Sequence, residues 1–308
     1  MTDLPCRLCS GKYRMDRHRA KAGGWVLGVL LHSGMLAGGP GDEANGERPF
    51  TVVGRDGMSF VYIPAASFVM GTTRAAEVKL RQNGWWNRFL KREQPAHPVV
   101  IEKPFLMGVT EVTQGQWTEV MGAPPKTVAF EGKDRPVDSV SFHEVEQFLA
   151  RLNQQSQSRF RLPTEAEWEY CCRAGDWDLF CMGTGGRSVA FDRLSRYTWY
   201  KANSGGSTHP AGRRQPNAWG LYDMLGNVWE WCEDYFQPGA YSERQGVVFD
   251  PRVDRLFPER VMRGGSYYLP AAFQRAGVRS GLLAGERSPY VGFRLVCELD
   301  FKGEDADE

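Results

Sequence analysis

Cysteine and histidine side chains are the groups most able to bind redox metals or act as nucleophiles, and this chain of 308 residues has seven cysteines and five histidines. Cys6 and Cys9 form a C-x-x-C pair, but no second pair or nearby histidine completes a zinc site. The histidines, at positions 18, 32, 97, 143 and 209, are scattered without metal-ligand spacing. His143 falls in the first turn of a predicted helix, where we expect a surface or packing role.

The other cysteines lie in the body of the chain, and their spacing specifies no metal site; they are Cys171, Cys172, Cys181, Cys232 and Cys297. We expect Cys6 and Cys9, which precede Met15, to lie outside the mature protein. The odd number that remains leaves at least one thiol without a disulfide if the chain is exported. The sequence also has no phosphate-binding glycine loop and no Gly-x-Ser-x-Gly nucleophile elbow. These residues therefore do not define a reaction by themselves.

Composition limits the class of protein and of partner. Lys and Arg total 38 against 37 Asp and Glu, a balance that does not suit a surface for neutralising phosphates, so we expect no nucleic-acid partner. Hydrophobic residues make up 42% of the chain, enough for a substantial core. Gly, Pro, Trp and Tyr are plentiful, whereas helical periodicity is confined to short windows. This pattern favours turns, short strands and aromatic anchors.

Residues 1–48 are interpreted as a leader and linker. A basic stretch after Met15 precedes an apolar stretch at 25–36 and then small or turn-forming residues at 37–41. This order is typical of a secretory signal and predicts a periplasmic or secreted protein. The alternatives are a disordered arm or a start codon placed too early, in which case the protein is cytoplasmic. The apolar stretch is too short and too interrupted to predict a stable membrane span.

The elements that must position any site are short. Alternating apolar residues predict strands at 60–64, 67–71, 99–101 and 105–109, and strand patterns return at 261 and 291. The clearest helix follows Ser141, which forms a capping box with Glu144. Thr164 and Glu167 repeat this device before a second helix that Gly175 stops, and a short helix begins near residue 113. The acidic tail at 301–308 is expected to be disordered.

A basic and aromatic stretch occupies residues 74–92, with Trp85 and Trp86 at its centre. One interpretation is a surface that contacts a polyanion or a membrane. The other is a solvated insertion, since Glu77 and Glu93 flank the basic residues. The flanking acidic residues favour the solvated insertion, and the stretch contains no motif with a chemistry that can be named.

Seven segments, in order, resemble the formylglycine-generating-enzyme-like (sulfatase-modifying factor) family. They are FVMG (68–71), VTEVTQGQW (109–117), PVDSVSF (136–142), RLPTEAEWEY (161–170), NAWGLYDMLGNVWEW (217–231), RGGS (263–266) and VGFR (291–294). The resemblance implies one domain at 49–300, with an α+β, loop-rich fold related to C-type lectins. Trp229 and Trp231 then serve as core anchors, pointing the same way if their segment is extended.

The resemblance also implies a calcium site. In the family, the segment that matches 223–230 holds calcium through two side chains and intervening carbonyls, and the matching residues here are Asp223, Gly226, Val228 and Glu230. Oxygen ligands from a turn-rich segment suit a hard cation. The alternative is a carboxylate that accepts backbone N–H groups within the same turn.

The family's copper chemistry is not expected. Its oxygen-dependent enzymes hold copper through two cysteines, the seventh and twelfth residues when the motif arginine, here Arg263, counts as the first. Those positions are Leu269 and Gln274, which cannot bind a soft metal ion. Ser266 matches another residue of that pocket, but a lone serine without a base has no mechanism. A further exported branch oxidises a siderophore precursor without the cysteine pair, so an enzyme stays open as an alternative.

The region between the last two motifs is the predicted ligand site. We expect a peptide or small molecule to bind a partly apolar pocket, whose residues are Trp229, Ser266, Tyr268, Leu269, Gln274, Leu282 and Tyr290. The variable proteins of diversity-generating retroelements place their ligand contacts in this same frame, which makes a non-catalytic binding protein the competing class. Alternatively, these residues only pack the last loops onto the domain.

Two further expectations follow from the resemblance. The family's disulfide between a helix and the last strand can be re-formed here by Cys172 and Cys297, although both residues also suit a buried core as small hydrophobic side chains. We expect the protein to be a monomer.

Overall fold

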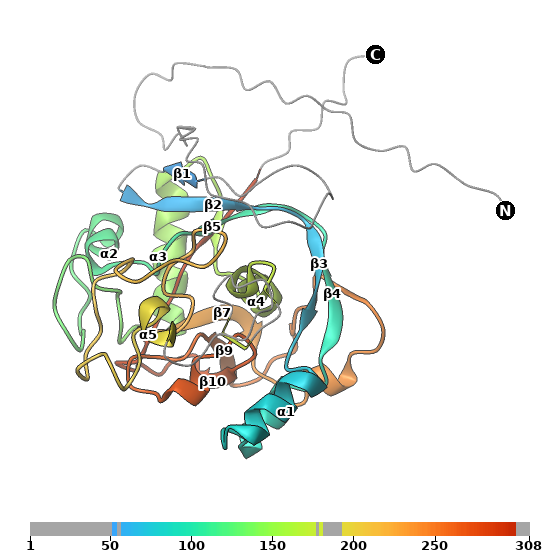
Figure 1. Ribbon diagram of the computed structural model, residues 1–308. Coiled ribbons are helices and arrows are strands. Elements are labelled where there is room, and N and C mark those ends of the chain that lie inside the picture. Colours follow the sequence, from blue (N-terminus) through green and yellow to red (C-terminus); the bar gives the residue numbers. More distant parts are fainter. Residues whose placement is uncertain (1–50, 54–56, 177–178, 181–192, 300–308) are drawn as a thin grey trace, which may run out of the picture.

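The fold is built from short strands in three sheets, described from a computed structural model of residues 51–53, 57–176, 179–180 and 193–299 (Figure 1). The predicted α+β, loop-rich class is confirmed. The interpreted leader at 1–48, the acidic tail at 301–308 and Cys181 lie outside the described residues. Among the residues described, no helix has both the length and the apolar character needed to cross a membrane.

The largest sheet has five strands in the order β1-β2-β5-β12-β6, and the others have the orders β10-β9-β7-β11 and β3-β4-β8. The first contains β1 (Thr51–Val53), β2 (Ser59–Ile63), β5 (Phe105–Gly108), β12 (Val296–Glu298) and β6 (Phe160–Arg161). The second contains β10 (Arg279–Leu283), β9 (Glu259–Arg263), β7 (Trp229–Tyr235) and β11 (Val291–Gly292). The third contains β3 (Ala66–Met70), β4 (His97–Ile101) and β8 (Val248–Phe249). Residues from both ends of the described chain therefore meet in the first sheet.

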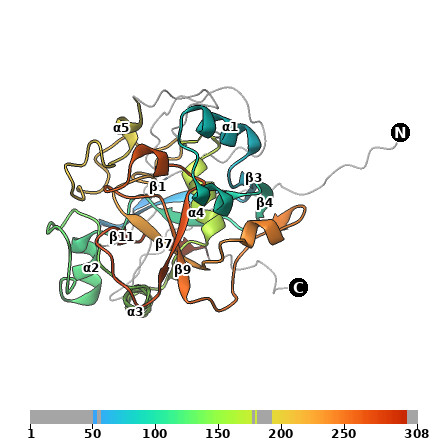
Figure 2. The same cartoon turned by 90° about the horizontal axis from the view of Figure 1, so that it is seen from below.

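The helices fill the space between and around the sheets. They are α1 (Arg74–Gln82), α2 (Gln114–Met121), α3 (Phe142–Gln155), α4 (Glu165–Arg173) and α5 (Leu194–Tyr197), with 3-10 turns η2 (Arg88–Glu93), η4 (Ala240–Glu243) and η5 (Ala271–Phe273). Helix α4 packs against β3, β7 and β9 and lies at the centre of the molecule (Figure 1). Helices α1 and α3 lie at opposite edges (Figure 2).

Two hydrophobic clusters form the core, and strand β12 separates them. Val296 points into the first cluster and Cys297 into the second, because neighbouring strand residues face opposite sides of a sheet. The second cluster contains both anchors, Trp229 and Trp231, as predicted from their spacing. Helix α3 closes this cluster, and its Phe148 stacks on Trp117 with ring centroids 5.3 Å apart.

Most predicted elements are found, and their predicted caps are confirmed. Ser141 and Thr164 form the capping boxes that begin α3 and α4. His143 lies on the exposed surface of α3, where it contacts Glu146. Helix α1 has no clear apolar period in the sequence, because Leu80 is its one fully buried apolar residue. Strands return earlier than the predicted position 261, since β7 begins at Trp229.

Candidate functional site

The loop after β9 contains Leu269 and Gln274, the two positions that the resemblance matches to the family's cysteine pair. Leu269 is half-buried and packs against the second core cluster, whereas Gln274 is fully buried. The Gln274 Nε2 atom donates to the carbonyl oxygens of Ser266 (3.1 Å) and Leu269 (3.3 Å). The amide therefore ties the loop to itself.

This loop is tightly closed. Gly265 has φ +78°, and a Cβ atom there would lie 2.7 Å from Gln274 Oε1, so only glycine fits. The Ser266 hydroxyl and Gln274 Oε1 are buried and have no hydrogen-bond partner among the described residues. The interior of this loop therefore holds two buried polar atoms without a partner among the described residues.

The outer residues of the predicted pocket form a surface. Tyr268 is 54% exposed and stacks on Tyr290, with ring centroids 5.0 Å apart. The Tyr290 carbonyl accepts the Trp229 N–H at 2.6 Å, which holds the tyrosines above the buried tryptophan. Leu282 and Leu269 pack against the same core cluster as Trp229. The structure thus brings the predicted residues together, as a covered interior and an aromatic outer face.

A first group of buried charges lies beneath the loop and is called the arginine cluster. Its members are Glu165, Glu169, Arg173, Arg263 and Arg279, and all are buried. Arg279 makes two contacts of 2.6 and 2.8 Å with Glu165, and Arg263 binds the Oε2 atom of Glu169 and the Val278 carbonyl. All four carboxylate oxygens in this cluster are hydrogen-bonded. Arg263 of the RGGS motif is therefore part of the scaffold.

A second group of buried charges is called the acidic cluster; its members are Glu111, Asp223, Glu230 and Arg294. Both Glu230 oxygens accept bonds from Arg294 at 2.6 Å, and the Trp168 indole N–H donates to Glu230 Oε2 at 2.5 Å. Glu230 is therefore fully satisfied within the protein. With three carboxyl groups and one guanidinium, this cluster has an excess of acid.

Two oxygens of the acidic cluster are left over. The Glu111 Oε2 and Asp223 Oδ1 atoms are buried and have no hydrogen-bond partner among the described residues. Their sister oxygens accept the Asn227 side-chain amide at 3.1 Å and the Gly212 N–H at 2.6 Å. Burial raises the pKa of Asp223 to about 6. Burial, together with the charges of Asp223 and Glu230, raises the pKa of Glu111 well above its ordinary value.

The predicted calcium ligands fit only in part. Asp223 has a free oxygen and a left-handed backbone with φ +53°, and Gly226 has no room for a side chain because a Cβ would lie 2.0 Å from Thr198 Oγ1. Val228 is also buried. The Glu230 carboxylate, however, is already bound by Arg294. Among the residues described, no group of three His, Cys, Asp or Glu side chains is arranged to hold a metal ion. A cation here would depend on Glu111, Asp223 and backbone oxygens.

Glu111 is the residue that sequence reasoning missed. It lies in the VTEVTQGQW motif, just before the capped helix α2, and it is fully buried. An acidic residue between two apolar strand-like positions, Val109 and Val112, was the available signal. The predicted calcium motif lies in another segment, residues 223–230.

Cys172 and Cys297, the residues of the predicted bridge, lie in different core clusters. Cys172 belongs to α4 and lies in the first cluster, whereas Cys297 belongs to β12 and lies in the second. Both side chains are buried, as small hydrophobic residues of a core are. The bridge between them stays a prediction.

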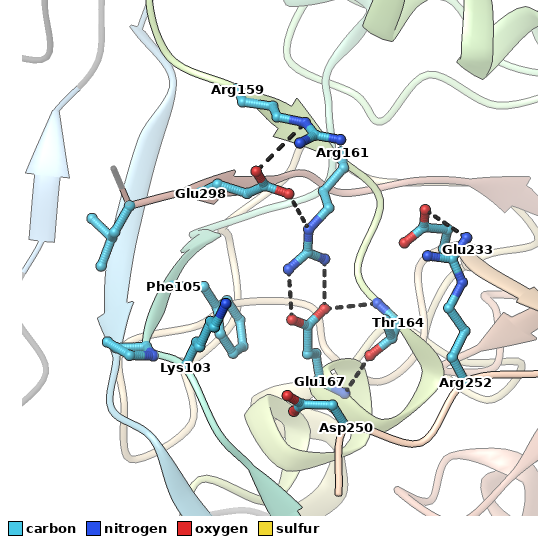
Figure 3. A pocket seen from close by; sticks show the side chains of 12 residues that line it. Lys103, Phe105, Arg159, Arg161, Thr164, Glu167, Glu233, Asp250, Arg252 and Glu298 are labelled. Carbon is cyan, nitrogen blue, oxygen red and sulfur yellow. Dashed lines mark hydrogen bonds and ion pairs between the residues drawn. The ribbon is translucent and has the colours of Figure 1, made fainter. Parts of the chain in front are cut away.

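A separate hollow of about 540 Å³ opens beside the N-terminus of α4 (Figure 3). Its lining includes four cations (Lys103, Arg159, Arg161, Arg252) and four anions (Glu167, Glu233, Asp250, Glu298). Arg161 binds Glu167 through two contacts of 2.7 Å and Glu298 through one of 3.1 Å. Because these charges largely pair with one another, the hollow does not favour a ligand of either sign.

Comparison with known proteins agrees with this geometry. The model of the sulfatase-modifying factor enzyme 1-like domain matches residues 49–299, so the chain belongs to that family. The formylglycine-generating enzyme of Streptomyces coelicolor is 36% identical over 158 residues, which are 48% of this chain and 50% of that enzyme. The match therefore spans only half the length of this curated relative.

Two solved structures share the fold over most of their length. PvdO from Pseudomonas aeruginosa superposes with a TM-score of 0.66 and 27% identity, covering 80% of this chain and 96% of PvdO. Treponema denticola variable protein 1 superposes with a TM-score of 0.62 and 26% identity, covering 79% of this chain and 95% of that protein. This chain therefore has the same fold as PvdO and as variable protein 1.

Proposed function

We propose that this protein is an exported ligand-recognition member of its family, which does not generate formylglycine by copper-thiolate chemistry. The observation that carries the proposal is Gln274. It stands in place of the second cysteine, is fully buried, and binds the loop carbonyls of Ser266 and Leu269. A carboxamide does not supply the soft thiolate ligand that Cu(I) prefers.

The ligand surface in this proposal is the aromatic outer face made by Tyr268 and Tyr290. Tyrosines offer a large, rigid contact area with a polar tip, which suits peptides and small polar molecules. The Lys201 ammonium lies 5.9 Å from the Tyr268 ring centroid and adds a positive charge at its edge. The expectation that variable proteins place ligand contacts between the last two motifs supports this choice of surface, and the fold is shared with variable protein 1.

Selection of displayed peptides on the purified protein tests this surface. Peptides that bind the wild type should lose most of their affinity for Tyr268→Ala, because the exposed ring supplies the contact and its loss leaves the core intact. The matched control is Phe249→Ala, which removes another exposed aromatic ring, 59% accessible, on β8. Equal binding by wild type and Tyr268→Ala, with unchanged melting temperatures, would overturn the assignment of the surface.

The same protein tests the chemistry. We expect no tight Cu(I) binding and no conversion of a sulfatase-type cysteine peptide to formylglycine. Stoichiometric copper together with aldehyde formation would contradict the proposal.

We further propose that a calcium ion occupies the acidic cluster. The unpaired Glu111 and Asp223 oxygens support it, since a hard cation would neutralise the excess of buried acid. Calcium should raise the melting temperature by mass action, and Glu111→Gln with Asp223→Asn should abolish that rise. The control is Glu233→Gln, a carboxylate in the charged hollow. A calcium response that persists in the double variant would rule out this site.

A further inference from the structure

The segment at 74–92, which we name the basic tongue, has a buried side and an exposed side. It consists of α1, a turn and most of η2, and α1 projects beyond the end of the β3–β4 pair (Figure 1). Leu80 and Leu90 are fully buried and fix the tongue to the domain. The exposed side carries three large apolar residues: Val78 (42% exposed), Trp86 (40%) and Phe89 (36%). The fold does not require these three side chains for its core.

The tongue concentrates the positive charge of the chain. It contains six Lys and Arg residues and one Glu, a net charge of +5, whereas the whole chain carries +1. The other residues together therefore carry −4. Such an asymmetry creates a local field that attracts anionic surfaces and repels cationic ones.

The cations surround the exposed aromatic rings. The Arg81 guanidinium lies 4.3 Å from the Trp86 ring centroid, and those of Arg88 and Arg92 lie 5.1 and 4.8 Å from that of Phe89. Aromatic rings bordered by Arg and Lys are the composition that binds the boundary between lipid headgroups and acyl chains. We propose that the basic tongue docks the protein on an anionic membrane surface, with Trp86 and Phe89 inserted at the headgroup level.

Buried hydrogen bonds tie the base of the tongue to the domain, which favours docking as a preformed unit. Glu93 forms a bidentate pair with Arg275 at 2.7 and 2.9 Å and accepts the Thr72 hydroxyl at 2.5 Å. Arg275 belongs to the loop that closes over Gln274, so the tongue has a fixed place relative to that loop. Little conformational entropy would then be lost on docking.

An open hollow of about 860 Å³ at the base of the tongue supports a lipid rather than a nucleic-acid partner. Apolar residues, among them Val69, Pro95 and Pro98, line it together with Arg74 and Lys91. Apolar walls with a basic rim match a phospholipid headgroup and its glycerol region. A nucleic acid would gain nothing from the apolar part.

Co-sedimentation with phospholipid vesicles tests the proposal. The full chain should bind vesicles of phosphatidylcholine with phosphatidylglycerol, bind pure phosphatidylcholine much more weakly, and release as salt rises. Arg88→Gln with Lys91→Gln should weaken binding roughly 10- to 30-fold, since each basic residue near an anionic surface contributes about fivefold. Trp86→Ala with Phe89→Ala should weaken it by roughly tenfold or more through lost apolar burial.

Matched variants elsewhere separate docking from general charge and from the leader. Arg213→Gln with Arg255→Gln removes the same charge from two other exposed arginines, and Phe249→Ala with Leu256→Ala removes other exposed apolar side chains. Both control pairs should bind vesicles as the wild type does. All variants keep residues 1–48, so any contribution of the leader is common to them. Wild-type binding by both tongue variants would overturn the proposal, and so would tight heparin binding without vesicle binding, which would indicate a polyanion partner.

Discussion

The arginine cluster and the acidic cluster are both buried in one core, yet they handle charge in opposite ways. In the arginine cluster three guanidinium groups bind two carboxylates, and every carboxylate oxygen has a donor. In the acidic cluster there is one guanidinium for three carboxyl groups; of these it binds only Glu230, and two oxygens of the other groups have no donor among the described residues. A buried carboxylate without a partner destabilises the folded protein unless a cation or a proton binds it. The arginine cluster is therefore a scaffold, whereas the acidic cluster is a candidate site.

The pKa values of the two clusters move in opposite directions for this reason. Burial alone would raise the pKa of Glu165 and Glu169, but the charges of Arg279, Arg173 and Arg263 bring it below the ordinary value. Burial raises the pKa of Asp223 and Glu111, and Arg294 does not compensate. Arg263 and Arg294 are both buried beside carboxylates. Arg263 helps to lower the pKa values of Glu165 and Glu169, whereas Arg294 leaves those of Asp223 and Glu111 raised.

The largest expected effect comes from breaking the arginine cluster. Arg263→Met removes a cation from two fully buried carboxylates, so we expect the free energy of unfolding to fall by about 3 to 5 kcal/mol. Denaturant unfolding of wild type and variant measures the difference. Arg263→Lys, which keeps a charge but loses the fork, should lie between them. A loss below about 1 kcal/mol for Arg263→Met would mean that the cluster is not a closed scaffold.

Neutralising the acidic cluster should have the opposite sign. Without calcium at neutral pH, Glu111→Gln with Asp223→Asn removes uncompensated buried charge, so we expect stabilisation by about 1 to 2 kcal/mol. The gain stays below the full electrostatic value because each new amide brings N–H donors that need partners. The measurement is chelator-treated denaturant unfolding. Marked destabilisation would show that the two carboxylates form stabilising bonds in the folded protein.

The pH dependence should separate the clusters in one protein. A carboxyl group with a raised folded pKa binds more protons when folded, so its contribution falls as pH rises from the unfolded pKa to the folded one. For Asp223 this window runs from 3.8 to about 6, and the loss should be on the order of 3 kcal/mol. Glu165 and Glu169, whose pKa values are lowered, contribute above 4.5 and lose their contribution in acid.

The comparison must be a difference between proteins, because other groups titrate in the same range. Burial raises the pKa of Asp138 to about 6 and that of Asp234 to about 7. The wild type minus the Glu111→Gln and Asp223→Asn variant should therefore show a slope between pH 4 and 6 that calcium removes. Parallel curves for the two proteins would mean that the acidic cluster does not titrate.

The sequence predicted the scaffold better than the site. Capping boxes at Ser141 and Thr164 and the paired anchors Trp229 and Trp231 depend on local spacing, and all four residues act as predicted. Glu230, a predicted calcium ligand, is bound by Arg294, which lies 64 residues away, and no local pattern reveals that contact. In the same way, no local pattern shows that Cys172 and Cys297 lie in different core clusters.

The orientation of Gln274 in the loop after β9 could not be predicted from the sequence either. Leu269 and Gln274 could be read as the loss of two thiols, but the sequence does not show that Gln274 turns inward and fills the space with its amide. That orientation depends on Gly265, whose left-handed backbone lets the Gln274 side chain approach. Polar residues with several rotamers are therefore harder to place from sequence than the apolar residues of a periodic helix.

The smallest expected effect concerns the exposed pair formed by Arg287 and Glu144, which serves as the solvent-facing reference for both clusters. Arg287 makes two contacts of 2.8 and 2.9 Å with Glu144, and these hydrogen bonds lower the pKa of Glu144 to about 2. The stabilising contribution of this carboxylate is therefore present above pH 4.5 and is lost as pH falls toward 2. Arg287→Gln should raise the Glu144 pKa toward its ordinary value, which NMR titration measures, while the melting temperature falls only slightly. That fall should vanish in high salt, because exposed pairs are screened whereas buried pairs are not. The free energy of unfolding could instead fall as far as in Arg263→Met and stay lowered in high salt. Exposure would then not distinguish Arg287 from Arg263, and the contrast between the two buried clusters would have another cause.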